Sequence, residues 1–100
     1  MGMDNPKLVT ILAEAALEAH IVRAIERLGA HGYTITEARC KGSRDVRDAR
    51  WDESRNIRVE VVCDEPVATS IAEHLRQHYY ENYAMILFVG DVAVLRPEKF

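Results

Sequence analysis

The clearest constraint on the fold is a regular alternation of apolar and polar residues near the middle of the chain, over Ile57–Cys63. Every second side chain is apolar, which places four of them on one side of an extended chain: Ile57, Val59, Val61 and Cys63. A period of two is typical of a strand with one buried face. Any fold for this chain therefore has to cover one face of a sheet.

Five further segments carry secondary-structure signals, and two of these are helical. Ala15–Leu28 has apolar residues at helical spacing, followed by Gly29 where a helix commonly ends in a left-handed turn. Asp64 and Pro66 suit the N-cap and first turn of a second helix, which continues to about Glu81. The other signals are apolar or β-branched runs that predict strands: Leu8–Leu12, His31–Cys40 and Tyr83–Leu95.

The order of these segments is strand, helix, strand, strand, helix, strand, in a chain of 100 residues, the length of one domain. Each helix connects two strands, which favours right-handed crossovers with both helices on one face of the sheet. The simplest solution is an α+β ferredoxin-like βαββαβ sandwich, formed by a single domain over residues 1–100. It leaves a long connection between the second and third strands, and such loops are usually functional.

Composition narrows the functional class. The net charge of −3 argues against a nucleic-acid partner, because duplex binders usually carry a basic face. Cys40 and Cys63 form neither a disulfide framework nor a zinc pattern, and two free thiols are typical of a reducing cytosol. The polar start lacks the apolar core of a signal peptide, and no run approaches a membrane span. The sequence therefore predicts a soluble, cytoplasmic protein.

Positive charge is concentrated in the long connection. Residues 39–58 carry seven positive and four negative charges, although the whole chain is negative. Arginine pairs with two phosphate or carboxylate oxygens at once, and backbone N–H groups beside a glycine form an anion-binding concavity. The segment thus offers donors for a phosphorylated small molecule: Lys41, Gly42, Ser43, Arg44 and Arg47. The alternative is that these charges only solvate a flexible connection, and their spacing does not decide between the two.

The chain resembles the PII-like signalling proteins of the bicarbonate-transporter-associated SbtB type, and in particular their carboxysome-associated branch. The resemblance covers nearly the whole chain and rests on these runs: Gly32-Tyr33-Thr34, Lys41-Gly42-Ser43-Arg44, Val46-Arg47 and the segment from Tyr80 to Leu87. It implies a homotrimer with adenine-nucleotide sites in the clefts between subunits. It also implies that Cys40–Asn56 is the T-loop, which rearranges with ligand and presents a surface to a partner.

The resemblance further assigns roles to particular residues. Phosphates would meet the donors of the long connection, and adenine and ribose would lie against strand ends: Thr34, Ile35, Thr36, Ile86, Leu87 and Phe88. The implied ligands are AMP or ADP together with bicarbonate. Arg96 would reach the phosphate of a neighbouring subunit, or belong to an ordinary charged tail. Trp51 would contact the partner, a bicarbonate transporter or a carboxysome component, or fold back on its own subunit.

The expected function is a sensor rather than an enzyme, since no Ser/His/Asp or Cys/His arrangement is legible, and no cofactor is expected. Asp45 and Asp48, which could hold Mg²⁺, are better explained as balancing the arginines. His74 and His78 lie four apart on a helix, but without a third ligand they are interpreted as surface histidines, so no metal site is predicted. The alternative function is a non-sensing structural trimer that organises carboxysome or bicarbonate-transporter components.

Overall fold

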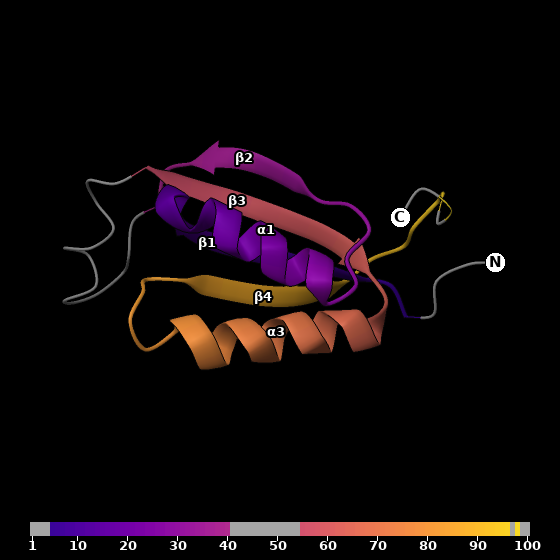
Figure 1. Ribbon diagram of the computed structural model, residues 1–100. Helices are drawn as coiled ribbons and strands as arrows, with labels where there is room; N and C mark the ends of the chain where they lie inside the picture. The colour runs from indigo at the N-terminus through magenta and orange to yellow at the C-terminus, as the bar shows by residue number, and fades with distance from the viewer. Residues whose placement is uncertain (1–4, 41–54, 97, 99–100) are drawn as a thin grey trace.

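The computed structural model describes residues 5–40, 55–96 and 98. Its elements follow the predicted order along the chain (Figure 1): β1 (Lys7–Glu14), the 3₁₀ turn η1 (Ala15–Leu17), α1 (Glu18–Arg27), β2 (Thr34–Ala38), β3 (Asn56–Cys63), α3 (Glu65–Tyr79) and β4 (Ile86–Asp91). The long connection between the second and third strands falls at residues 41–54, outside the described residues.

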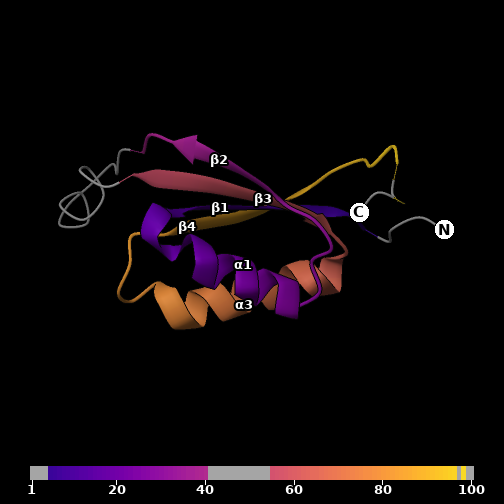
Figure 2. The same cartoon turned by 45° about the horizontal axis from the view of Figure 1, so that its top comes forward.

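The four strands form one sheet in the order β2-β3-β1-β4, and each neighbouring pair is antiparallel. β1 pairs with β3 over its whole length, from Lys7 opposite Cys63 to Glu14 opposite Asn56. Both helices lie on the same side of this sheet (Figure 2). The predicted α+β ferredoxin-like sandwich is therefore confirmed.

The hydrophobic core lies between the sheet and the helices. Alternate residues of the two central strands are buried in it: Val9, Ile11, Ala13, Ile57, Val59, Val61 and Cys63. The helices contribute the opposing side chains: Ile21, Ile25, Ala68, Ile71 and Leu75. Removing a large aliphatic side chain from water contributes about 1.5–3 kcal/mol. β3 is therefore a strand with one face buried in the core, as its alternation predicts.

Two predicted strands are longer than the observed ones, because pairing with a neighbour decides where a strand ends. β2 finds partners on β3 only over Thr34–Ala38, so the ends of the predicted segment 31–40 are not strand. Before β4, the backbone N–H of Tyr83 donates to the carbonyl of Tyr79 at 2.9 Å. That bond ties the segment to the end of α3, and β4 starts only at Ile86.

The observed starts of the two helices also differ in detail from the predicted ones. The first begins as the 3₁₀ turn η1, and α1 proper starts at Glu18. Asp64 occupies the N-cap position of α3 with extended backbone angles, but its side chain makes no capping hydrogen bond. The backbone carbonyl of Asp64 accepts the first hydrogen bond of the helix, which the backbone N–H of Ala68 donates at 2.9 Å.

Gly29 ends α1 with a positive φ of 114°, as the sequence predicts. We expect Gly29→Ala to lower the free energy of unfolding by about 1–3 kcal/mol, because residues with a side chain rarely adopt this backbone conformation. A Cβ atom here would also lie 3.2 Å from Cγ2 of Val67. Urea unfolding followed by circular dichroism measures the change. Gly32→Ala is the control, since its Cβ would meet nothing within 4 Å; equal effects of the two substitutions would contradict the explanation.

In the described part of the chain, neither helix combines the length and the apolar character that crossing a bilayer requires.

Candidate functional site

The side of the sheet away from α1 and α3, here called the open face, is covered by neither helix (Figure 2). Strand alternation places every second strand residue on it, with Thr10 paired between Glu60 and Phe88. Two large apolar side chains of β4 lie here at the sheet edge, Phe88 with 54% and Ile86 with 43% of its surface exposed. Neighbouring exposed apolar side chains favour this face as an interaction surface.

One row of directly paired residues crosses the open face at its end near the long connection. Thr36 of β2 lies opposite Arg58 of β3, Arg58 lies opposite Leu12 of β1, and Leu12 lies opposite Ile86 of β4. Paired residues on neighbouring strands share a face and lie about 5 Å apart. This row therefore brings a hydroxyl, a guanidinium and two aliphatic side chains, from four strands, into one line.

A groove of about 480 Å³ lies over this row, here called the loop-end groove. It is lined by the four residues of the row and by the end of β2 with the residues that follow it: Leu12, Thr36, Glu37, Ala38, Arg39, Cys40, Arg58 and Ile86. Its volume is within the range of small-molecule sites. Cys40 is the last described residue before the long connection, so the predicted phosphate donors follow the groove directly in sequence.

The groove arginine on β3 is not held by a strong ion pair. Nε of Arg58 lies 3.9 Å from a carboxylate oxygen of Glu60. This separation exceeds hydrogen-bond length, and exposed pairs of this kind contribute little to stability. A guanidinium has five N–H donors. The Arg58 side chain therefore has donors available for an anion in the groove.

The structure separates the predicted strand-end residues into three groups. Thr36 and Ile86 line the loop-end groove. Thr34 and Phe88 lie on the open face but not among the groove residues. Ile35 and Leu87 point to the helix side, where they pack against the core. The side chains of this last pair are thus not brought to the groove.

Arg96 lies away from the loop-end groove. β4 runs from Ile86 at the groove to Asp91, about 17 Å along the strand at 3.3 Å per residue. Arg96 follows beyond that end and is exposed, with its Nε 3.6 Å from a carboxylate oxygen of Glu98. The other predicted site residues lie outside the described residues: Lys41, Gly42, Ser43, Arg44, Arg47 and Trp51.

Six groove residues are missing from the sequence-based assignment: Leu12, Glu37, Ala38, Arg39, Cys40 and Arg58. The two arginines belong to the cationic segment, so their charge was a usable signal. Leu12 offered no sequence signal, because only strand pairing brings it beside Arg58.

The two cysteines lie in different surroundings. Cys40 lines the groove, and partial burial raises the pKa of its thiol. Cys63 is buried in the core, where burial first and the charge of Asp64 second raise its pKa to about 11.

Comparisons with known proteins agree with this architecture. The model of the nitrogen regulatory protein P-II matches residues 6–99, and the chain therefore belongs to the P-II family. The predicted relation to PII-like signalling proteins is thereby confirmed, whereas the SbtB type stays a prediction.

Solved structures give the same result. A PII-like signaling protein from Thermus thermophilus is 46% identical, with 100% of this chain and 99% of that chain covered and a TM-score of 0.80. CPII from Thiomonas intermedia, bound to ADP, AMP and acetate, is 26% identical over 95% of this chain and 94% of that one, with a TM-score of 0.79. The same protein bound to ADP and bicarbonate matches with 28% identity, the same coverage and a TM-score of 0.78.

Proposed function

We propose that this protein is a PII-like sensor that binds ADP or AMP, together with bicarbonate, at the loop-end groove. The observation that carries the proposal is the position of Arg58 in a groove that borders the cationic connection. The CPII structures, which hold ADP, AMP and bicarbonate on a similar fold, support the choice of ligand. Bound ligand reports inorganic-carbon or energy status in the cytoplasm, and the T-loop at residues 40–56 transmits it.

The chemistry of the groove suits an adenine nucleotide. Leu12 and Ile86 offer apolar surface for a base, while Arg39 and Arg58 offer charge for phosphate oxygens. Lys41, Gly42, Ser43, Arg44 and Arg47 follow directly and add donors. Bicarbonate is a small planar anion that a guanidinium fork can hold with two hydrogen bonds. The groove and the connection together thus offer enough donors for both ligands.

The assembly that we propose is a homotrimer in which the open faces meet. The apolar side chains on this face would then be buried against neighbouring subunits, which removes the exposed apolar surface of Phe88 and Ile86 from water. The groove would lie beside a neighbouring subunit, whose Arg96 could reach the phosphates. This arrangement gives Thr34 and Phe88 a role at the subunit boundary rather than in the groove itself.

Signalling follows from the position of the groove at the base of the T-loop. A ligand that contacts the loop binds its conformations with different affinities, and so shifts their populations. The loop surface, with Trp51 as the expected contact, would then bind a bicarbonate transporter or a carboxysome component in one ligand state and not in the other. An SbtB-type, carboxysome-associated protein would behave in this way.

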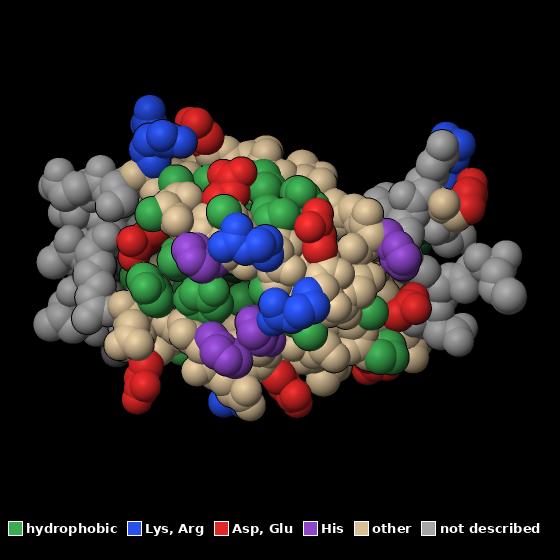
Figure 3. All heavy atoms as spheres, in the orientation of Figure 1, with side chains coloured by type: hydrophobic (Ala, Val, Ile, Leu, Met, Phe, Trp, Pro, Cys, Tyr) green, Lys and Arg blue, Asp and Glu red, His purple; other side chains and the backbone are tan. Residues whose placement is uncertain are grey.

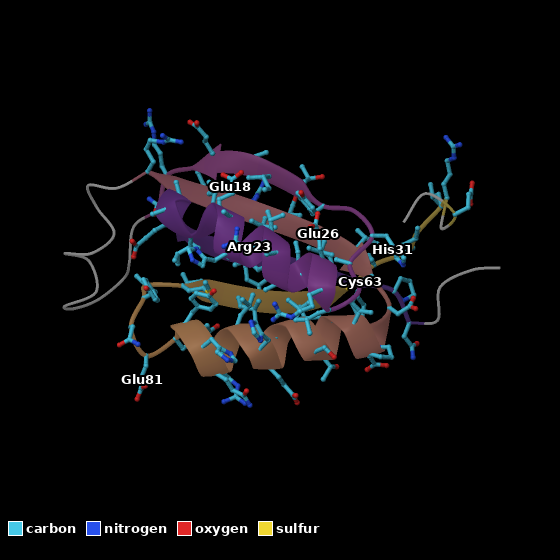
Figure 4. All side chains as sticks on the ribbon, in the orientation of Figure 1. Glu18, Arg23, Glu26, His31, Cys63 and Glu81 are labelled. Carbon is cyan, nitrogen blue, oxygen red and sulfur yellow. The ribbon has the colours of Figure 1, made fainter. Side chains whose placement is uncertain are left out.

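Calorimetric titration with ADP and AMP, with and without bicarbonate, tests the proposal. We expect Arg58→Ala to weaken ADP binding about 10- to 100-fold, because a hydrogen bond to a charged group contributes about 1.5–3 kcal/mol. Arg23→Ala is the matched control, since Arg23 is exposed on the outer side of α1 (Figure 4). Bound nucleotide should also slow modification of Cys40 by a thiol reagent. The proposal fails if saturating ADP gives no heat, or if both arginine variants bind alike.

A structural trimer without a ligand is the second candidate, favoured by the apolar open face rather than by the groove. The two candidates differ in the response to Arg44→Ala with Arg47→Ala. In a sensor, this double variant loses its response to nucleotide while the trimer persists. In a structural trimer, assembly and partner binding both stay unchanged, and neither depends on nucleotide.

A further inference from the structure

Two imidazole rings are stacked on α3, in the helix layer on the opposite side of the sheet from the open face. His74 and His78 lie one helical turn apart, with ring centroids separated by 4.2 Å and an angle of 29° between the planes. Histidine side chains gather over α3 on the face of the molecule seen in Figure 3. His78 is exposed and His74 is partly so, which makes the pair accessible from solvent.

We propose that His74 and His78 form a binding site for a late divalent transition-metal ion. The proposal is independent of nucleotide binding, because neither histidine lines the loop-end groove. Two side chains four apart on a helix face the same direction and can hold one ion between them.

A backbone hydrogen bond prepares one of the two rings. Nδ1 of His78 lies 2.8 Å from the carbonyl oxygen of His74, and since a carbonyl can only accept, Nδ1 carries the hydrogen and donates it. In the neutral ring the lone pair is then on Nε2, at the outer end of the side chain. Metal-bound histidines commonly donate their second ring nitrogen to a carbonyl or carboxylate in this way. The bond therefore selects the tautomer whose outer nitrogen can bind a metal, and the stacked rings have to turn so that these nitrogens meet at one ion.

A cation on the other helix acts on the same pair. Arg27 of α1 is among the charges that act on His74, and its positive charge repels a metal ion. The site should therefore be of modest affinity and should need a metal that imidazole binds strongly.

The ligand set decides the class of metal. Among the described residues, no group of three or more His, Cys, Asp or Glu side chains could hold a metal, so water has to complete the coordination. Affinity for such nitrogen ligands increases along the divalent series to Cu²⁺. We expect Cu²⁺ to bind most tightly and Ni²⁺ next, whereas Mg²⁺ and Ca²⁺, which prefer oxygen ligands, should not compete.

Equilibrium dialysis of the tag-free, full-length protein against Ni²⁺ tests the site, since Ni²⁺ avoids the thiol oxidation that Cu²⁺ would cause. The expected result is one ion per chain, with affinity reduced at least about tenfold in His78→Ala, because losing a ligand costs no less than losing an outer-shell partner of a ligand. His31→Ala is the control, because His31 lies beyond the end of α1 (Figure 4).

A second variant, H78A/R76H, keeps the number of histidines but moves the ring off the shared face. It should bind as weakly as H78A, and circular dichroism checks that both variants remain folded. The proposal is overturned if H78A binds Ni²⁺ like the wild type, if H31A loses as much affinity, or if H78A/R76H restores binding. ADP titration of H78A should match the wild type, which separates this result from the fate of the nucleotide proposal.

Discussion

Replacing Phe88 by aspartate should convert the proposed trimer into monomers of 11.4 kDa. Phe88 contributes exposed aromatic surface to the open face, with Ile86 two residues earlier on the same strand. In the proposed assembly this surface is buried between subunits. An unpaired carboxylate at such a contact costs several kcal/mol, because burial removes its water without supplying a partner. Light scattering coupled to size-exclusion chromatography measures the mass directly.

Thr69→Asp is the matched control for this experiment. It introduces the same charge at an exposed position of α3, in the helix layer. We expect this variant to remain a trimer. A trimeric Phe88→Asp variant would show that the subunits meet elsewhere, and a monomeric wild-type protein would contradict the proposed assembly altogether.

Truncating Ile71 to alanine should lower the free energy of unfolding by about 2–5 kcal/mol. The Ile71 side chain is fully buried, with 0% of its surface exposed, and it belongs to the core between α3 and the sheet. The neighbouring side chains cannot close the resulting cavity completely. This loss is a large share of the roughly 5–15 kcal/mol that stabilises a typical domain.

Urea unfolding at one fixed protein concentration measures this change, since the stability of an oligomer depends on concentration. Ser70→Ala serves as the reference, because Ser70 is the exposed neighbour of Ile71 on the same helix. We expect the reference to change stability by less than about 0.5 kcal/mol. Comparable effects at both positions would mean that α3 does not contribute to the core as described.

The sequence predicted those parts of the fold that depend on local pattern. The alternation over Ile57–Cys63 predicted β3 to within one residue, since one buried face imposes a period of two on any strand. Gly29 predicted the end of α1 because few other residues adopt its backbone conformation. The ends of β2 and β4 were not predictable in this way, because they depend on which residues of a neighbouring strand are available to pair.

The candidate site was less accessible to sequence analysis for the same reason. The predicted donors for an anion were visible as a local excess of positive charge, but the floor of the groove combines residues distant in sequence. Leu12, Arg58 and Ile86 lie side by side only because β1 pairs with both β3 and β4. No local sequence pattern indicates which residues of these strands lie opposite one another. The row could be described only after the pairing of the strands was known.

The pairing of Ala38 with Asn56 has a consequence for how proteins of this type diversify. These two positions, one at the last residue of β2 and one at the first of β3, lie opposite each other in the sheet, so the intervening segment leaves and re-enters the fold at adjacent points. Closing a loop between such points costs only about 0.6 kcal/mol more for each doubling of its length. Substitutions and insertions in this segment should therefore cost little stability and leave the row of paired residues at the floor of the groove unchanged.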